Sequence, residues 1–240
     1  MKRRFVIFGI AVFSSLLLSA CGNKTTSSKT ASPTQSQKMI DLAVADRPYI
    51  SLIPREDGHQ LKMKINKIPS SVVQIESELI YTAKDADTKM EIEKGVSDTI
   101  KVDSQNIDRD LLLGTASCTN GCKYKYDNGV DSGTLTLTFT TQSGQSYQYI
   151  SPFSLKSGAD LKKSGTIGLD TENFSIKATP SSAGEFFVLI KNYGIPSGSS
   201  AKINYSVFSS SSGTGKVTSI TPETVTKDNK NQISGDYLGQ

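Results

Sequence analysis

The run Thr134-Leu-Thr-Leu-Thr-Phe139 alternates a hydroxyl side chain with a large apolar one. Successive side chains of a β-strand point to opposite faces of a sheet, so this period of two is typical of a strand with one buried face and one solvated face. The run therefore predicts a strand whose leucines and phenylalanine face a core. The same period recurs at 61–65 and at 73–81, where the residues that share the apolar face are Val73, Ile75, Leu79 and Tyr81.

Turn signals separate these runs. A glycine preceded by Asp, Asn or Ser tolerates the positive φ of tight hairpin turns, and such pairs stand at Asp57-Gly58, Asn120-Gly121, Asn128-Gly129 and Ser143-Gly144. Strands that recur about every 8 to 12 residues, with turns between them, are typical of β-sandwiches. We therefore predict an all-β chain in which residues 39–157 form an antiparallel β-sandwich.

The strand rhythm from Asp41 to Leu155 resembles that of the immunoglobulin-like and fibronectin-type sandwiches of bacterial surface proteins. The resemblance implies an immunoglobulin-like arrangement of strands and, by itself, no activity. Two marks of true immunoglobulin domains are missing. The chain has no tryptophan, and Cys118 and Cys122 are too close together in the sequence to join two sheets.

A stretch rich in Gly, Ser and Lys from Lys156 to Gly165 predicts a boundary, after which a second set of strand-like runs begins. About 60 residues is a small number for an independent core. Residues 164–222 are therefore predicted either to form a second, smaller β module or to complete the first sandwich. The polar residues 223–240 are predicted to be a loose C-terminal tail.

The first twenty residues have the parts of a secretory signal: a basic start, an apolar stretch and a short cleavage region. The apolar stretch is shorter than the roughly 20 residues that a membrane-spanning helix needs. The cleavage region, Leu18-Ser19-Ala20-Cys21, resembles the lipobox of bacterial lipoproteins. That resemblance implies that residues 1–20 are a signal peptide and that Cys21 becomes the lipidated first residue of the mature protein.

A diacylglyceryl group on Cys21 predicts an extracytoplasmic protein anchored to a bacterial membrane, at the cell surface or in the periplasm, because two acyl chains give stable anchoring. Residues 21–38 are almost devoid of apolar side chains, which predicts a flexible linker. Three of the 27 basic residues leave with the signal, so 24 basic residues face 23 acidic ones. This balance does not predict a nucleic-acid partner.

Cys118 and Cys122 flank a three-residue segment that ends in glycine. If this segment is a hairpin loop, the two cysteines face each other across its neck at a Cα separation of about 5.5 Å, which suits a disulfide. Export favours oxidation, so we predict a local disulfide and no cofactor. The alternative is a metal-handling or enzyme-accessory lipoprotein that uses both cysteines and His59, since such side chains bind soft metals.

The single histidine limits catalysis. A Ser-His-Asp site would have to use His59, which follows Asp57-Gly58 and is predicted to be an exposed turn residue. The segment Ser199-Ser-Ala-Lys202 matches the Ser-x-x-Lys pattern of penicillin-binding enzymes. It lies in a loop, however, and both Lys-Ser-Gly triplets precede it in the chain, whereas those enzymes have the opposite order. We predict no catalytic residue and a non-enzymatic protein.

Four tyrosines are candidates for binding. Tyr124 and Tyr126 share a strand face with Cys122, and Tyr147 and Tyr149 share another. Paired hairpins could present such rings to sugars or proteins, or the rings could pack within the core. The predicted function is therefore a binding, adhesion or structural module that contacts an envelope protein or glycan.

Asp127 and Asp131 flank Asn128-Gly129 and are weak candidates for calcium ligands, because carboxylate oxygens are the ligands that calcium prefers. The spacing is not that of an EF-hand loop, and an Asn-Gly pair between two aspartates is also an ordinary turn. The sequence leaves both interpretations open.

Overall fold

The computed structural model describes residues 41–85, 87–119 and 121–240, which belong to one compact unit. The predicted signal peptide, the predicted lipidation site Cys21 and the predicted linker, residues 21–38, lie outside the described residues. No helix in the described ranges is long and apolar enough to span a membrane.

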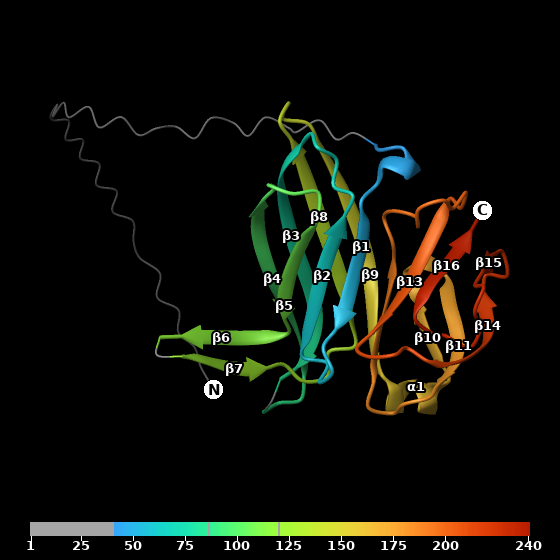
Figure 1. Ribbon diagram of the computed structural model, residues 1–240. Coiled ribbons are helices and arrows are strands. Elements are labelled where there is room, and N and C mark those ends of the chain that lie inside the picture. The colour runs from blue at the N-terminus through green and yellow to red at the C-terminus, as the bar shows by residue number, and fades with distance from the viewer. Residues whose placement is uncertain (1–40, 86, 120) are drawn as a thin grey trace, which may run out of the picture. The chain divides into compact units, whose positions relative to one another are not determined.

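The described chain is almost entirely β-structure, which confirms the predicted all-β class (Figure 1). The strands are β1 (Tyr49–Pro54), β2 (Gln60–Asn66), β3 (Val72–Lys84), β4 (Glu91–Lys101), β5 (Ile107–Leu112), β6 (Gly114–Cys118), β7 (Cys122–Tyr126), β8 (Ser132–Thr141), β9 (Ser146–Ser157), β10 (Thr166–Leu169), β11 (Phe174–Pro180), β12 (Phe186–Lys191), β13 (Ile203–Ser209), β14 (Gly215–Thr221), β15 (Val225–Thr226) and β16 (Gly235–Gly239). The helical segments are η1 (Val44–Asp46), α1 (Gly158–Ser164) and η2 (Asp170–Glu172).

A large antiparallel sheet runs through the body in the order β15-β16-β13-β12-β9-β8-β3-β4. Two three-stranded sheets, β1-β2-β5 and β10-β11-β14, cover parts of it. The side chains of β12 show which face each one covers. Val188 and Ile190 belong to the core under β1-β2-β5, whereas Phe187 and Leu189 belong to the core under β10-β11-β14. Because neighbouring side chains of a strand point to opposite faces, the two small sheets lie on opposite faces of the large one.

Strands β12 and β13 continue the sheet that β9 and β8 begin, so residues 164–222 share the large sheet with the first half of the chain. Strands β10, β11 and β14 form a separate sheet over a second core on the other face. The antiparallel β-sandwich prediction is confirmed. The strand order differs from that of immunoglobulin domains, whose seven or nine strands divide between only two sheets.

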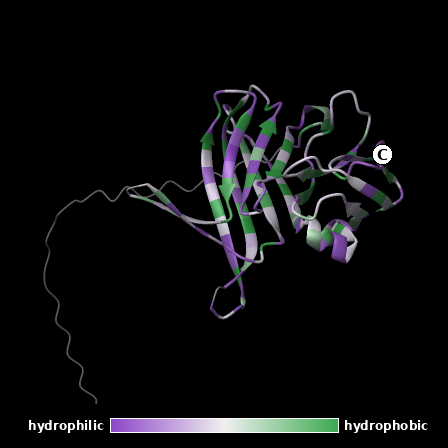
Figure 2. Ribbon diagram, turned by 60° about the horizontal axis from the view of Figure 1, so that its bottom comes forward, coloured by the Kyte–Doolittle hydropathy of each residue, from purple (hydrophilic) through white to green (hydrophobic). Residues whose placement is uncertain are grey.

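The period-two prediction holds for β8, whose Leu135, Leu137 and Phe139 are fully buried. Alternating hydrophobic and hydrophilic bands along the long strands are visible in Figure 2. The prediction is wrong for Val73, which is 41% exposed, while Val72 is buried. The register between β3 and β8 shifts between Val72 and Gln74. The extra residue of such a bulge exchanges the two faces of the strand.

The predicted loose tail, residues 223–240, is wrong, because its final residues form part of the body. Strand β16 pairs with β13, and Ile233 and Tyr237 are fully buried. The hydroxyl of Tyr237 donates a hydrogen bond to the carbonyl of Ile233 at 2.7 Å. The segment has only four apolar side chains, Val225, Ile233, Tyr237 and Leu238, and they show no regular period. Strand β16 forms because β13 is already part of a sheet and offers it a partner.

The predicted boundary stretch contains α1, which turns the chain from β9 towards β10. Ser157 caps the start of the helix by accepting a hydrogen bond from the Asp160 N–H at 3.0 Å. Gly165, with φ +69°, ends it in the left-handed conformation. The sequence contains both caps, but seven residues are too few to show a helical period.

A polar network ties β1 to the second half of the chain. The amide of Asn192 accepts the Ile50 N–H at 3.0 Å and donates to the Ile50 carbonyl at 2.7 Å, and it also donates to Ser206 Oγ at 2.9 Å. Asp236 accepts from Ser206 at 2.6 Å and from the hydroxyl of Tyr49 at 2.7 Å. The Asn192 side chain thus satisfies both backbone groups of Ile50, as the backbone of a neighbouring strand would.

Candidate functional site

Strands β6 and β7 form a hairpin, residues 114–126, that we call the arm. Neither of its strands pairs with another strand of the described chain, and Figure 1 shows it extending sideways from the sandwich. Its described side chains between Thr115 and Lys125 are exposed. An isolated two-stranded hairpin is marginally stable in water, so the arm needs support at its tip and at its base.

The tip is closed by the two cysteines. Cys118 stands opposite Cys122 in the register of the arm, and their Sγ atoms are 2.19 Å apart with a Cα separation of 4.1 Å. The predicted local pairing of these residues is therefore present, at a shorter Cα distance than expected. Gly121 has the positive φ, +94°, that the hairpin loop was predicted to need.

The base is held by Asp127, which is buried. One carboxylate oxygen accepts a hydrogen bond from the hydroxyl of Tyr81 at 2.8 Å, and the other accepts one from Lys94 Nζ at 2.5 Å. Burial, together with the hydrogen bond to this carboxylate, raises the pKa of Tyr81 above its ordinary value. The backbone N–H of Asp127 donates to the Leu113 carbonyl at 3.0 Å, which closes the neck of the arm.

These contacts use the carboxylate oxygens that a calcium ion would need. Both carboxylate oxygens of Asp127 are engaged by protein donors, and Asp131 accepts a hydrogen bond from the hydroxyl of Ser132 at 2.9 Å. Within the described ranges no three His, Cys, Asp or Glu side chains gather as metal ligands would. Asp127 is an anchor of the arm.

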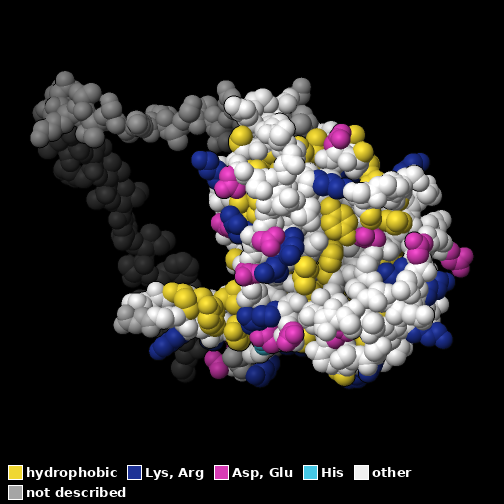
Figure 3. All heavy atoms as spheres, in the orientation of Figure 1, with side chains coloured by type: hydrophobic (Ala, Val, Ile, Leu, Met, Phe, Trp, Pro, Cys, Tyr) yellow, Lys and Arg dark blue, Asp and Glu magenta, His cyan; other side chains and the backbone are white. Residues whose placement is uncertain are grey.

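The two faces of the arm differ in character. The register places Ala116, Tyr124, Tyr126 and the cysteine pair on one face, which we call the aromatic face. The opposite face carries hydroxyl and basic side chains, namely Thr115, Ser117, Lys123 and Lys125. Tyr124 is 55% exposed, and Figure 3 shows hydrophobic side chains gathered on the arm. The aromatic face is therefore open to a ligand.

Three parallel rings line up from the base of the arm outwards. The imidazole of His59 stacks on Tyr126 at 4.6 Å between ring centroids, and Tyr126 lies 6.2 Å from Tyr124, with an angle of 7° between the planes in both pairs. His59 was predicted to be an exposed turn residue. It is half-buried, because its turn brings it against β7.

Two charged side chains of the same turn complete this site. The guanidinium carbon of Arg55 lies 5.2 Å from the centroid of the Tyr126 ring. Both oxygens of Asp57 accept hydrogen bonds from Arg55, at 2.7 and 2.6 Å, and this pairing lowers the pKa of Asp57 below its ordinary value. Sequence reasoning missed both residues, although the segment Arg55-Glu-Asp-Gly-His59 is a compact group of charges at a turn.

Cys118, Cys122 and His59, the residues of the metal-handling alternative, do not lie together in the structure. His59 is stacked at the base of the arm, and the cysteine pair closes its tip. Tyr126 stands four positions after Cys122 on β7, a distance of about 13 Å along the strand. The two cysteines, being bonded to each other, offer no thiolate pair.

Tyr147 and Tyr149 do not face a ligand, which corrects the second half of the tyrosine prediction. Both are buried. Tyr147 stacks on Phe139 at 4.8 Å, and the hydroxyl of Tyr149 donates to the Lys191 carbonyl at 2.7 Å. A period of two shows which side chains share a face, but it does not show which face another sheet covers.

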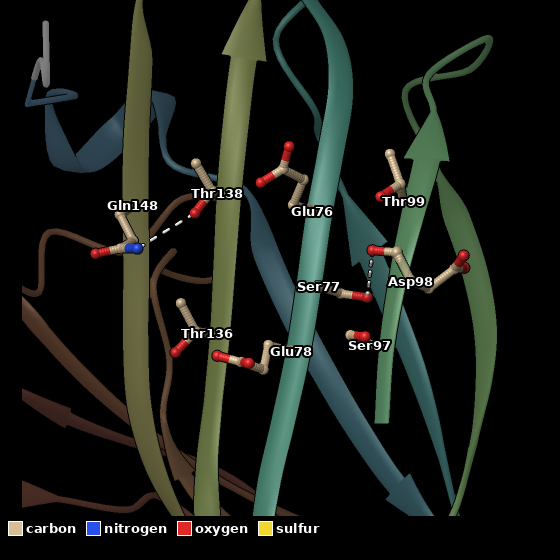
Figure 4. Close-up of a pocket in the computed structure, with 9 residues that line it drawn as sticks. All are labelled: Glu76, Ser77, Glu78, Ser97, Asp98, Thr99, Thr136, Thr138 and Gln148. Atoms are coloured by element: carbon tan, nitrogen blue, oxygen red, sulfur yellow. Dashed lines mark hydrogen bonds between the residues drawn. The ribbon is translucent and has the colours of Figure 1, made fainter. Parts of the chain in front are cut away.

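A second recess lies on the face of β4-β3-β8-β9 that points away from β1-β2-β5. It is a polar hollow of about 470 Å³, and Figure 4 shows Glu76 and Glu78 of β3 beside the hydroxyls of Thr136 and Thr138. Gln148 donates to Thr138 Oγ1 at 3.2 Å. No aromatic ring and no cation is among the lining residues, so the hollow offers hydrogen bonds without a surface for stacking. Sequence reasoning did not single it out.

Comparison with protein families, with curated proteins and with solved structures found no match for this chain.

Proposed function

We propose that this chain is a lipid-anchored, extracytoplasmic and non-enzymatic binding module whose arm binds a glycan of the bacterial envelope. The proposal rests on a row of parallel rings that ends in the exposed Tyr124, on an arm that is closed at its tip and anchored at its base. Holding exposed rings on a rigid support lowers the ordering cost of binding.

The aromatic face suits a sugar. The face of a tyrosine ring is electronegative, and the axial C–H groups of a pyranose are positively polarised, so the two stack favourably. Arg55 and Asp57 at the end of the ring row can hydrogen-bond to sugar hydroxyls. A stable protein interface buries about 800 Å² per partner and involves roughly 20–30 residues. The aromatic face has far fewer side chains, which favours a short glycan segment over a protein.

The anchoring part of the proposal rests on the lipobox-like segment that ends in Cys21. A lipid at this residue would hold the body at a membrane surface, within reach of envelope polymers. The test is metabolic labelling with a clickable fatty acid. Labelled wild-type protein and unlabelled Cys21→Ser protein are expected. A wild-type chain that takes up no label and stays in the cytoplasm would refute the anchored localisation.

The binding part is tested with full-length protein and envelope glycan from which proteins have been removed by protease. Tyr124→Ala is expected to weaken co-sedimentation at least about fivefold, because truncating a tyrosine that anchors a binding surface costs more than about 1 kcal/mol. The matched control is Lys123→Ala on the opposite face of the arm, which should bind as the wild type does. Equal loss in both variants would contradict the role of the aromatic face. Binding that disappears with protease treatment would identify a protein partner instead.

A further inference from the structure

Strand β4 forms one edge of the large sheet and pairs on one side with β3 (Figure 1). It is eleven residues long. A long edge strand presents a row of unpaired backbone groups that can accept another strand. In the described part of the chain no strand occupies the outer side of β4.

Hydrogen bonds at both ends of β4 show which residues direct their backbone outwards. Asp85 N–H donates to the Met90 carbonyl at 2.9 Å, and Val102 N–H donates to the Val73 carbonyl at 3.0 Å. Hydrogen-bonded and non-hydrogen-bonded pairs alternate in an antiparallel ladder. The even-numbered residues from 90 to 102 therefore bond to β3, and the odd-numbered residues from 91 to 101 direct their N–H and C=O groups to the free edge.

The sequence of β4, Glu91-Ile-Glu-Lys-Gly-Val-Ser-Asp-Thr-Ile-Lys101, is complementary to its own reverse. In an antiparallel pair of two copies centred on Val96, opposite charges stand opposite each other and the isoleucines meet. Each of the following pairs occurs twice: Glu91 with Lys101, Ile92 with Ile100, and Lys94 with Asp98. All odd residues then meet odd residues, so the outward backbone groups of both copies can bond.

Neighbouring registers lose this match. A register that joins odd to even residues cannot form the ladder, because the facing backbone groups would not point at each other. Centring the pair on Gly95 sets Ile92 against Asp98, and centring it on Ser97 sets Lys94 against Ile100. The register centred on Val96 is thus strongly preferred.

We propose that two copies of this chain associate through β4, edge to edge about a two-fold axis at Val96, and extend the large sheet across the interface. Charged residues on an edge strand usually prevent such pairing, but here each charge meets its opposite. Lys94 already contacts Asp127 and Asp98 already contacts Arg109, so the second copy extends existing ion pairs into a network. This proposal does not depend on the lipid or on the glycan.

The first experiment uses a single cysteine on the axis. In full-length Val96→Cys protein, the two introduced thiols face each other in a non-hydrogen-bonded pair, with Cα atoms about 4.5 Å apart, which permits a disulfide. Mild oxidation should give a covalent dimer on a non-reducing gel. Glu93→Cys is the matched control, because its two copies would lie about 20 Å apart. Wild-type protein reports any linkage through the native cysteines. Equal linkage in Val96→Cys and Glu93→Cys, or none in Val96→Cys, overturns the proposal.

The second experiment measures the dimer dissociation constant by analytical ultracentrifugation. Glu91→Lys places like charges opposite each other twice, and the constant should rise about tenfold. Adding Lys101→Glu to the same chain restores opposite charges and should return the constant to near the wild-type value. Glu56→Lys, in the β1–β2 turn, controls for net charge. A monomeric wild type, or a dimer that the swap does not rescue, overturns the proposed register.

Discussion

Strand β12 and the arm differ in how many of their side chains are removed from water. The central side chains of β12 are fully buried on both faces of the sheet, whereas almost every described side chain of the arm is exposed. Buried apolar area is the main source of folding free energy. The body therefore gains its stability around β12, and the arm, which adds little, is free to carry surface chemistry.

The largest loss of stability is expected for Phe187→Ala in β12. Removing a fully buried phenylalanine leaves a cavity and should lower the free energy of unfolding by about 3 to 5 kcal/mol. Chemical denaturation measures the change. The control is Ile150→Ala on β9, whose side chain is 58% exposed and whose loss should cost little. If both variants lose a similar free energy of unfolding, the buried side chains of β12 do not contribute more to stability than exposed ones.

The next largest effect is expected for Asn192→Ala, directly after β12. The substitution leaves the Ile50 N–H and carbonyl buried without the amide that pairs with them. Unsatisfied buried groups of this kind cost roughly 1 to 3 kcal/mol each, so we expect a loss of about 3 kcal/mol in thermal or denaturant unfolding. Asn231→Ala, at an exposed asparagine, should stay near the wild type. A wild-type midpoint for Asn192→Ala would contradict the proposed role of the network.

A smaller effect is expected at the base of the arm. Asp127→Ala removes the acceptor of Tyr81 and Lys94, and we expect a loss of about 2 kcal/mol. Hydrogen exchange of the amides in the arm should become faster, while amides of β12 keep their protection. Asp131→Ala is the control and should leave the arm unchanged. Unaltered exchange in the Asp127→Ala arm would show that another contact anchors it.

The smallest effect on the body is expected for the double variant Cys118→Ser, Cys122→Ser. Closing so short a loop restricts the unfolded chain only slightly, so the loss should not exceed about 2 kcal/mol. Exchange near the tip should nevertheless increase, and glycan binding should weaken as the arm loses its order. A large drop in global stability would mean that the arm contributes to the core after all.

Local patterns in the sequence predicted much of the fold. Alternation in 134–139 identified a strand and its buried face, and the glycines at the predicted turns all have positive φ. The cysteine pair was predictable because its two members are neighbours in a short hairpin. The bulge at Val72 and Val73 escaped prediction, since it depends on how β8 aligns with β3.

The candidate site was predictable only in part. Tyr124 and Tyr126 were identified from their shared strand face, but the same reasoning selected Tyr147 and Tyr149, which the core covers. Nothing along the chain brings the turn at Arg55 to His59 next to β7, because that contact depends on the neighbouring β2–β5 ladder and on the neck of the arm. The lipid anchor at Cys21 stays a prediction.

The all-β class could be predicted from the sequence, as could the two faces of most strands and the covalent tip of the arm, because each depends on residues a few positions apart. Only the folded chain shows which faces are covered, that the C-terminal residues join the sheet, and that His59 stacks on Tyr126 at the base of the arm. Such outcomes depend on contacts between distant segments. The amide of Asn192 and the backbone of Ile50, 142 residues apart, are an example. No pattern within either segment indicates its partner.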